Sequence, residues 1–174
     1  EQLHNGYLGI RKKMVRQLFA KYANRIIAIS KVNAHTLHVE GTEVIYNSVD
    51  FSVFNKQLDA AACKQQYQLT GDFIFSFIGG SVLSKGADML VDAFLQVWQQ
   101  HRDSQLVIAG HFNTDPTKPM NRIEKKVHEV CDAHPALKTA IRFTGPLPQV
   151  ATLLAASDVL LWPATTPHFA RPIM

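Results

Sequence analysis

Short apolar runs alternate with amphipathic segments along most of this chain, a pattern typical of parallel strands joined by crossover helices. From it we expect strands at residues 25–29, 43–46, 73–78, 105–109, 140–143 and 158–162. The clearest helix is expected at 86–100, where apolar residues from Ala87 to Trp98 recur at helical spacing and can bury one stripe against a sheet. The pattern predicts an α/β fold with a doubly wound parallel sheet, whose ligands bind at the carboxyl ends of the strands.

Capping and turn residues predict the limits of the other helices. Ser30 suits the N-cap of a helix that we expect to end at Gly41. Further helices are expected at about residues 56–68 and around Ile123 to Cys131. A last helix is expected to begin with Pro148 in its first turn, because proline lacks the amide hydrogen that a first-turn residue leaves unpaired.

The composition excludes several classes of protein. The 174 residues are 47% hydrophobic and 18% charged, as in soluble globular domains. Because the sequence has no apolar run long enough for a membrane span and no signal-peptide pattern, a cytoplasmic location is the default. Cys63 and Cys131 lie in helical patterns and are expected to be small buried hydrophobes. His35 and His38 lack a third ligand nearby, so we expect surface histidines and no metal site.

Positive charge gathers near the start of the sequence, although the net charge is only +4. The basic residues there are Arg11, Lys12, Lys13, Arg16, Lys21 and Arg25. Met14, Leu18 and Tyr22 share this segment at helical spacing, so it is interpreted first as an amphipathic helix with a solvated basic face. A helix lying on an anionic membrane surface remains the alternative. We expect no nucleic-acid partner.

Residues 79–86 (GGSVLSKG) follow a predicted strand and precede a predicted helix, where backbone amides and the helix dipole favour an anion. The segment matches neither the dinucleotide fingerprint nor a Walker A loop, since glycine follows the lysine here. Lys85 can place its ammonium against a diphosphate. A glycine-rich turn with a solvated lysine is the alternative interpretation of the same residues.

A second candidate anion site follows the last predicted strand. Pro172 suits the first position of a helix, so the amides of Phe169, Ala170 and Arg171 are expected to point from a helix start into the cleft. The sequence shows no nucleophile elbow, no zinc-protease motif and no carboxylate pair at a recognisable spacing.

Several separated segments resemble, in their order, the motifs of retaining family 4 glycosyltransferases of GT-B fold, and the resemblance covers nearly the whole chain. The matching segments are residues 28–31, 47–50 with Phe54, 77–86, 106–110, 143–147, 156–158 and 163–174. The resemblance implies two Rossmann-like parts: residues 1–50 as the tail of an acceptor domain and connector, and residues 51–174 as an incomplete nucleotide-sugar (donor) domain. It also implies a fragment that lacks segments at both ends.

Two departures from the family pattern concern charged residues. Gly80 stands where the family has an arginine in its phosphate loop, and Pro167 stands where the first glutamate of the Glu, seven residues, Glu motif belongs. The second glutamate would follow Met174, so no catalytic residue is assigned. The resemblance implies donor contacts from Gly80, Lys85, the Leu147 backbone, and the backbone amides of Phe169, Ala170 and Arg171.

The function implied by the resemblance is transfer of a hexose from a nucleotide-diphosphate sugar with retention of configuration, in polysaccharide or glycoconjugate synthesis. No cofactor and no metal are expected. The expected partners are the nucleotide sugar, the rest of the same polypeptide and, through the parent protein, the inner face of a membrane. The 174 residues alone are expected to bind donor without turnover. Two alternatives stay open: a noncatalytic sugar-nucleotide-binding or scaffolding module, and a flavodoxin-like regulatory domain, which would need an acidic cluster after Ile78 that the sequence lacks.

Overall fold

The computed structural model describes residues 7–55 and 57–164, and the chain divides between Val49 and Asp50 into two compact units. The first unit contains helix α1 (Tyr7–Tyr22), strand β1 (Ile26–Ala28), helix α2 (Lys31–Leu37) and strand β2 (Thr42–Val44). The two strands pair in parallel. The assignment of the two units to acceptor and donor domains stays a prediction.

Helix α2 begins where the sequence predicts and ends earlier. The Ser30 hydroxyl accepts a hydrogen bond from the Asn33 amide at 3.0 Å, which confirms the predicted N-cap. The helix was expected to continue to Gly41 but ends at Leu37, because His38 adopts a left-handed conformation with φ 51°. The His38 amide then donates to the Ala34 carbonyl and closes the last turn. Histidine is among the residues that enter this conformation more readily than most.

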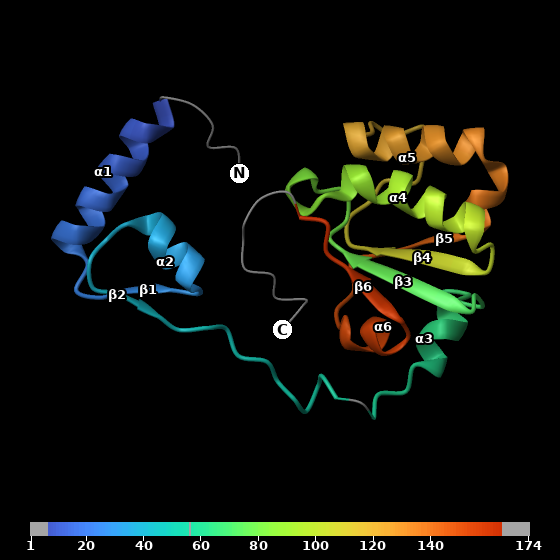
Figure 1. Ribbon diagram of the computed structural model, residues 1–174, viewed down its shortest axis with the longest axis horizontal. Helices are drawn as coiled ribbons and strands as arrows, with labels where there is room; N and C mark the ends of the chain where they lie inside the picture. The colour runs from blue at the N-terminus through green and yellow to red at the C-terminus, as the bar shows by residue number, and fades with distance from the viewer. Residues whose placement is uncertain (1–6, 56, 165–174) are drawn as a thin grey trace. The chain divides into compact units, whose positions relative to one another are not determined.

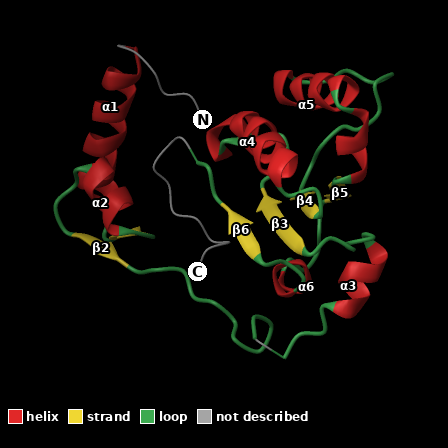
Figure 2. Cartoon of the chain, turned by 45° about the vertical axis from the view of Figure 1, so that its right-hand side comes forward, coloured by secondary structure: helices red, strands yellow, loops and turns green. Residues whose placement is uncertain are grey.

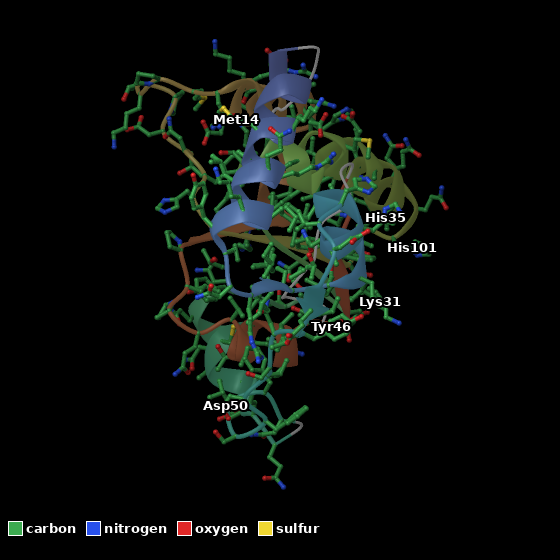
Figure 3. All side chains as sticks on the ribbon, turned by 90° about the vertical axis from the view of Figure 1, so that its left-hand side faces the viewer. Met14, Lys31, His35, Tyr46, Asp50 and His101 are labelled. Atoms are coloured by element: carbon green, nitrogen blue, oxygen red, sulfur yellow. The ribbon has the colours of Figure 1, made fainter. Side chains whose placement is uncertain are left out.

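Polar and apolar side chains of the first unit are exposed to solvent in the described structure. His35 (Figure 3) and His38 are exposed, as predicted. Their ring centroids lie 4.9 Å apart. Met14, Leu18 and Tyr22 of α1 are also exposed in the described structure. Within the described residues, no helix combines the length and the apolar character needed to cross a membrane.

The second unit is built on a parallel sheet in the strand order β5-β4-β3-β6. Its strands are β3 (Phe73–Ile78), β4 (Ser104–Ala109), β5 (Ile141–Gly145) and β6 (Val159–Leu161). Its helices are α3 (Ala61–Gln66), α4 (Ala87–Gln100), α5 (Arg122–Ala133) and α6 (Ala151–Ala155), with short 3-10 turns at Leu83–Lys85 and Pro135–Thr139. Helices α4 and α5 cover one face of the sheet, and α3 and α6 cover the other (Figures 1 and 2). This arrangement confirms the predicted doubly wound α/β fold.

Each face of the sheet has its own apolar core because successive strand residues point to opposite sides. Phe77 and Leu106 pack with Leu90 and Val127 of α4 and α5. Ile74 and Val107 pack on the other face, with residues of α3 and α6 that include Leu153. Both cysteines are buried, as expected, and neither forms a disulfide.

Two predicted helix starts in this unit are wrong. The helix expected from residue 56 starts at Ala61, whose amide donates to the Asp59 carboxylate at 2.8 Å. Pro148 lies outside α6, which starts at Ala151. The first hydrogen bond at the start of α6 runs from the Leu154 amide to the Val150 carbonyl at 3.0 Å, so Pro148 precedes the helix.

Side chains fix the amino ends of the strands. The side-chain carbonyl of Gln105 accepts hydrogen bonds from the amides of Thr70 and Gly71, both at 2.7 Å. The Asp158 carboxylate accepts one from the Ile74 amide at 2.7 Å. These bonds anchor the edge of the sheet that lies opposite the carboxyl ends.

Two adjacent residues of α4 test the packing on the sheet face that α4 and α5 cover. Leu90 is 4% exposed and Met89 is 49% exposed. We expect Leu90→Ala to lower the free energy of unfolding by about 2–5 kcal/mol, because it leaves a cavity in the core. Met89→Ala is the matched control and should change it by less than about 1 kcal/mol. Urea unfolding followed by circular dichroism measures both, and equal losses would contradict this packing.

Candidate functional site

The order of the strands creates a topological switch point between β3 and β6. From β3, the chain adds β4 and then β5 on one side of the sheet and returns to add β6 on the other. Connections that leave in opposite directions open a crevice at the carboxyl ends of such strands, and ligands of open α/β sheets bind there. Figure 2 shows β3 and β6 side by side with their carboxyl ends at the same edge.

The segments that follow β3 and β6 touch at this point. A Cβ atom added at Gly86 would lie 1.8 Å from the carbonyl oxygen of Pro163, so only glycine allows the two backbones to come this close. Gly86 also has φ 78° and directly precedes α4. The contact places the segment after β6 beside the first turn of α4.

The start of the loop after β3 is held by backbone hydrogen bonds to the end of β4. The amides of Gly79 and Gly80 both donate to the Ala109 carbonyl at 2.9 Å. The Ser81 amide donates to the His111 carbonyl at 2.9 Å. The amide of Gly80 is therefore occupied. In the first turn of α4 the Met89 amide donates to the Gly86 carbonyl at 3.1 Å, so the donors that this helix start can offer are the amides of Ala87 and Asp88.

Gly80 is required by the shape of this loop. Its φ is 59°, and a Cβ atom there would lie 2.3 Å from the carbonyl oxygen of His111. From the sequence, Gly80 is interpreted as the loss of an arginine that would contact phosphate. The structure gives a steric reason for the glycine, because no side chain fits at this position unless the backbone moves.

Lys85 lies across the end of β3. A Cβ atom added at Gly79 would be 2.9 Å from Cδ of Lys85, so the aliphatic part of the lysine covers that glycine. Residues 7–55 and 57–164 offer its ammonium group no hydrogen bond and no ion pair. Lys85 is therefore a half-buried side chain whose positive charge has no partner among those residues, next to the helix start that favours anions.

Sequence analysis missed Glu124, which joins three segments at the same edge. One carboxylate oxygen accepts hydrogen bonds from the Ser81 hydroxyl at 2.9 Å and from the Asn113 amide at 2.8 Å. The other accepts from the Asn121 amide at 2.9 Å, which completes a capping box at the start of α5. The sequence signal for the cap was present, because Asn121 and Glu124 have the spacing of that motif.

Glu124 is a buried anion, with 6% of its surface exposed. Burial alone would raise the pKa of its carboxyl group, but the hydrogen bonds from Asn113, Asn121 and Ser81 outweigh burial and hold the pKa below its usual value. The site therefore contains an ionised carboxylate, and both of its oxygens accept hydrogen bonds from the protein.

The loops after β4 and β5 are also joined. The Gly110 amide donates to the Gly145 carbonyl at 2.9 Å, and the rings of Phe112 and Phe143 lie 4.6 Å apart. Leu147 follows β5, and its half-buried side chain packs against the core. The contact predicted for Leu147 involves only its backbone.

The remaining predicted residues lie outside the described part of the chain. They are Phe169, Ala170 and Arg171, together with Pro167 and Met174. Of the predicted donor contacts, the structure therefore brings Gly80 and Lys85 together on the loop after β3 and places Leu147 after β5.

A hollow of about 1060 Å³ lies at the opposite edge of the sheet, where Phe73, Gln100 and Ser104 form part of its lining. It faces the amino ends of β3 and β4, so we place the functional site at the carboxyl ends. No group of three or more potential metal ligands occurs among the residues that the structure describes.

Solved structures with the same fold are found among glycosyltransferases. HepE of Anabaena in complex with UDP-glucose has a TM-score of 0.77 and 22% identity, over 94% of this chain and 45% of HepE. Sucrose-phosphate synthase of Thermosynechococcus elongatus has a TM-score of 0.71 and 18% identity, over 94% of this chain and 40% of the synthase. The C-terminal domain of the glycosyl transferase group 1 family protein LpcC from Francisella tularensis has a TM-score of 0.59 and 18% identity, over 72% and 64%.

The chain spans less than half the length of HepE and of the synthase. At these identities the comparison shows a shared fold, the Rossmann-like α/β fold of GT-B glycosyltransferases. No curated protein matches the chain by sequence. The model of the family described as "Glycosyl transferases group 1" matches residues 72–174, which is more than half of the chain. The chain therefore belongs to the glycosyl transferases group 1 family.

Proposed function

We propose that this chain carries the nucleotide-sugar site of a glycosyltransferase that moves a hexose to an acceptor with retention of configuration. The observation that carries the proposal is the Lys85 side chain at the switch point, before the first turn of α4, whose ammonium has no partner among the described residues. This pairing of a cation with a helix start suits a diphosphate, whose charge both groups stabilise. Family membership and the UDP-glucose bound by HepE support this donor class.

In the proposed reaction, the bond between the sugar and the diphosphate breaks and negative charge grows on the leaving phosphate. We propose that Lys85 and first-turn amides of α4 face that charge, so that they stabilise the transition state without reorganising. Gly80 contributes by lacking a side chain, which allows the loop after β3 to lie against the backbone of His111. We propose that the backbone of Leu147 contacts the base and that the amides of Phe169, Ala170 and Arg171 contact phosphate or sugar. The reaction is proposed to need no metal.

The acceptor and the cellular setting belong to the same proposal. Residues 1–50 are assigned to an acceptor domain, and the 174 residues alone are expected to bind donor without turnover. A role in polysaccharide or glycoconjugate synthesis at the inner face of a membrane fits the exposed apolar residues and the basic residues of α1. A noncatalytic sugar-nucleotide-binding module is the second candidate, because Gly80 and Pro167 replace charged residues of the family pattern. Transfer of labelled sugar by the full-length protein distinguishes the two.

Removing the lysine tests the diphosphate site. We expect Lys85→Ala to weaken binding of a nucleoside diphosphate by about 1.5–3 kcal/mol, because one charge-assisted contact to phosphate is lost. Isothermal titration of the full-length protein with UDP, GDP and ADP measures the effect. Lys64→Ala is the matched control, since it removes the same charge from an exposed position on α3. Equal affinities for wild type and Lys85→Ala would contradict the assignment.

Restoring the family arginine tests the explanation for Gly80. We expect Gly80→Arg to weaken nucleotide binding rather than strengthen it, because its Cβ collides with the His111 backbone. Its stability loss should exceed that of Gly145→Ala, which carries only the strain of a left-handed residue, of about 1–3 kcal/mol. Gly145 has φ 69° and nothing within 4 Å of an added Cβ, so it isolates the strain from the collision. Calorimetry and thermal unfolding provide the two measurements, and tighter binding by Gly80→Arg would refute the steric account.

A further inference from the structure

We propose that Glu124 is a positioning residue for the nucleotide site, which holds the loop after β3 in its anion-binding shape through Ser81. The inference rests on the proposed function, because it assigns a role to a residue that does not itself face the diphosphate. This role accounts for a buried carboxylate beside a site that we propose binds an anion.

The hydrogen bonds of Glu124 exceed what a helix cap requires. A capping box uses the Asn121 amide, and one carboxylate oxygen is enough for it. The second oxygen is shared by the Ser81 hydroxyl and the Asn113 amide, which belong to the loops after β3 and β4. The carboxylate therefore joins the start of α5 to both loops.

Ser81 is fixed from two directions by these contacts. Its amide donates to the His111 carbonyl at 2.9 Å. Its hydroxyl donates to Glu124 and accepts from the side-chain amide of Asn121 at 2.8 Å. Ser81 directly follows Gly80, which lies against the backbone of His111 after β4. The bonds of Ser81 therefore fix the position of the residue from which the loop continues to Lys85 and α4.

The sign of the effect separates positioning from electrostatics. A negative charge near a diphosphate opposes binding, so removal of the charge alone should strengthen binding. Positioning predicts the opposite for Glu124→Gln. A glutamine has one acceptor oxygen and one NH₂ group, so the NH₂ must face a backbone amide of either Asn113 or Asn121. One backbone anchor is lost whichever way the side chain turns. It is that of Asn113, which lies two residues after the His111 carbonyl that holds the Ser81 amide, or that of Asn121, whose side chain donates to the Ser81 hydroxyl.

The experiment uses the full-length protein and titrates UDP, GDP and ADP into wild type, Glu124→Gln and Ser81→Ala. For the diphosphate that wild type binds, we expect each variant to lower the affinity about fivefold, the loss that corresponds to one hydrogen bond. Ser81→Ala keeps the backbone bond to His111, so it tests the loop even if Glu124→Gln folds poorly. Ser81→Thr restores the hydroxyl and should recover most of the affinity.

The matched control is Gln105→Met, which leaves the amides of Thr70 and Gly71 without their acceptor at the amino ends of the strands. It should lower the melting temperature as Glu124→Gln does and leave nucleotide affinity unchanged. If wild type binds the nucleotide and both Glu124→Gln and Ser81→Ala bind it equally well or better, this inference is overturned while the proposed function stands. An affinity loss in Gln105→Met that equals theirs also overturns it. Absence of binding by wild type overturns the proposed function and this inference together.

Discussion

The pairing of β3 with a strand on each side is the constraint on which the second unit depends. β3 is hydrogen-bonded to β4 over its whole length and to β6 over residues 75–77. Helices cover both faces of the strand, which explains its nearly continuous apolar sequence, and only Phe73 at its amino end is exposed. The same pairing determines that the loops after β3 and β6 start next to one another. The site is thus a consequence of the strand order before any side chain is considered.

Backbone contacts then set the shape of the carboxyl edge. At Gly80 and Gly86 the neighbouring chain lies where a side chain would be. Where two backbones lie this close, water is excluded from their N–H and C=O groups. These groups then need hydrogen-bond partners from the main chain or from buried side chains. Glu124 supplies them for Asn113 and Asn121, and the Ala109 carbonyl supplies them for the two glycines before Ser81. Lys85 remains as a charge that the protein does not neutralise within its described residues.

Much of the fold could be predicted from the sequence because its signals are local. Residues close to one another in the chain determine the alternation of strands and helices. They also determine the apolar stripe of α4 and the N-cap at Ser30. The errors arose where local signals did not decide the backbone conformation. His38 ended α2 in place of Gly41 because it adopts a left-handed conformation, and α6 starts at Ala151 and not at Pro148. Membership of the glycosyl transferases group 1 family is confirmed, whereas the narrower assignment to family 4 and the retention of configuration stay predictions.

The candidate site was predicted less completely for the same reason. The bond from Ser81 to Glu124 joins residues far apart in the chain, and no local pattern indicates it. The contact between Gly86 and Pro163 has a further consequence for how such sequences can change over time. Any larger residue at 86 would collide with the main-chain carbonyl at 163, which every amino acid carries. No substitution at 163 removes that collision, so in descendants of this chain position 86 should stay glycine whatever residue stands at 163.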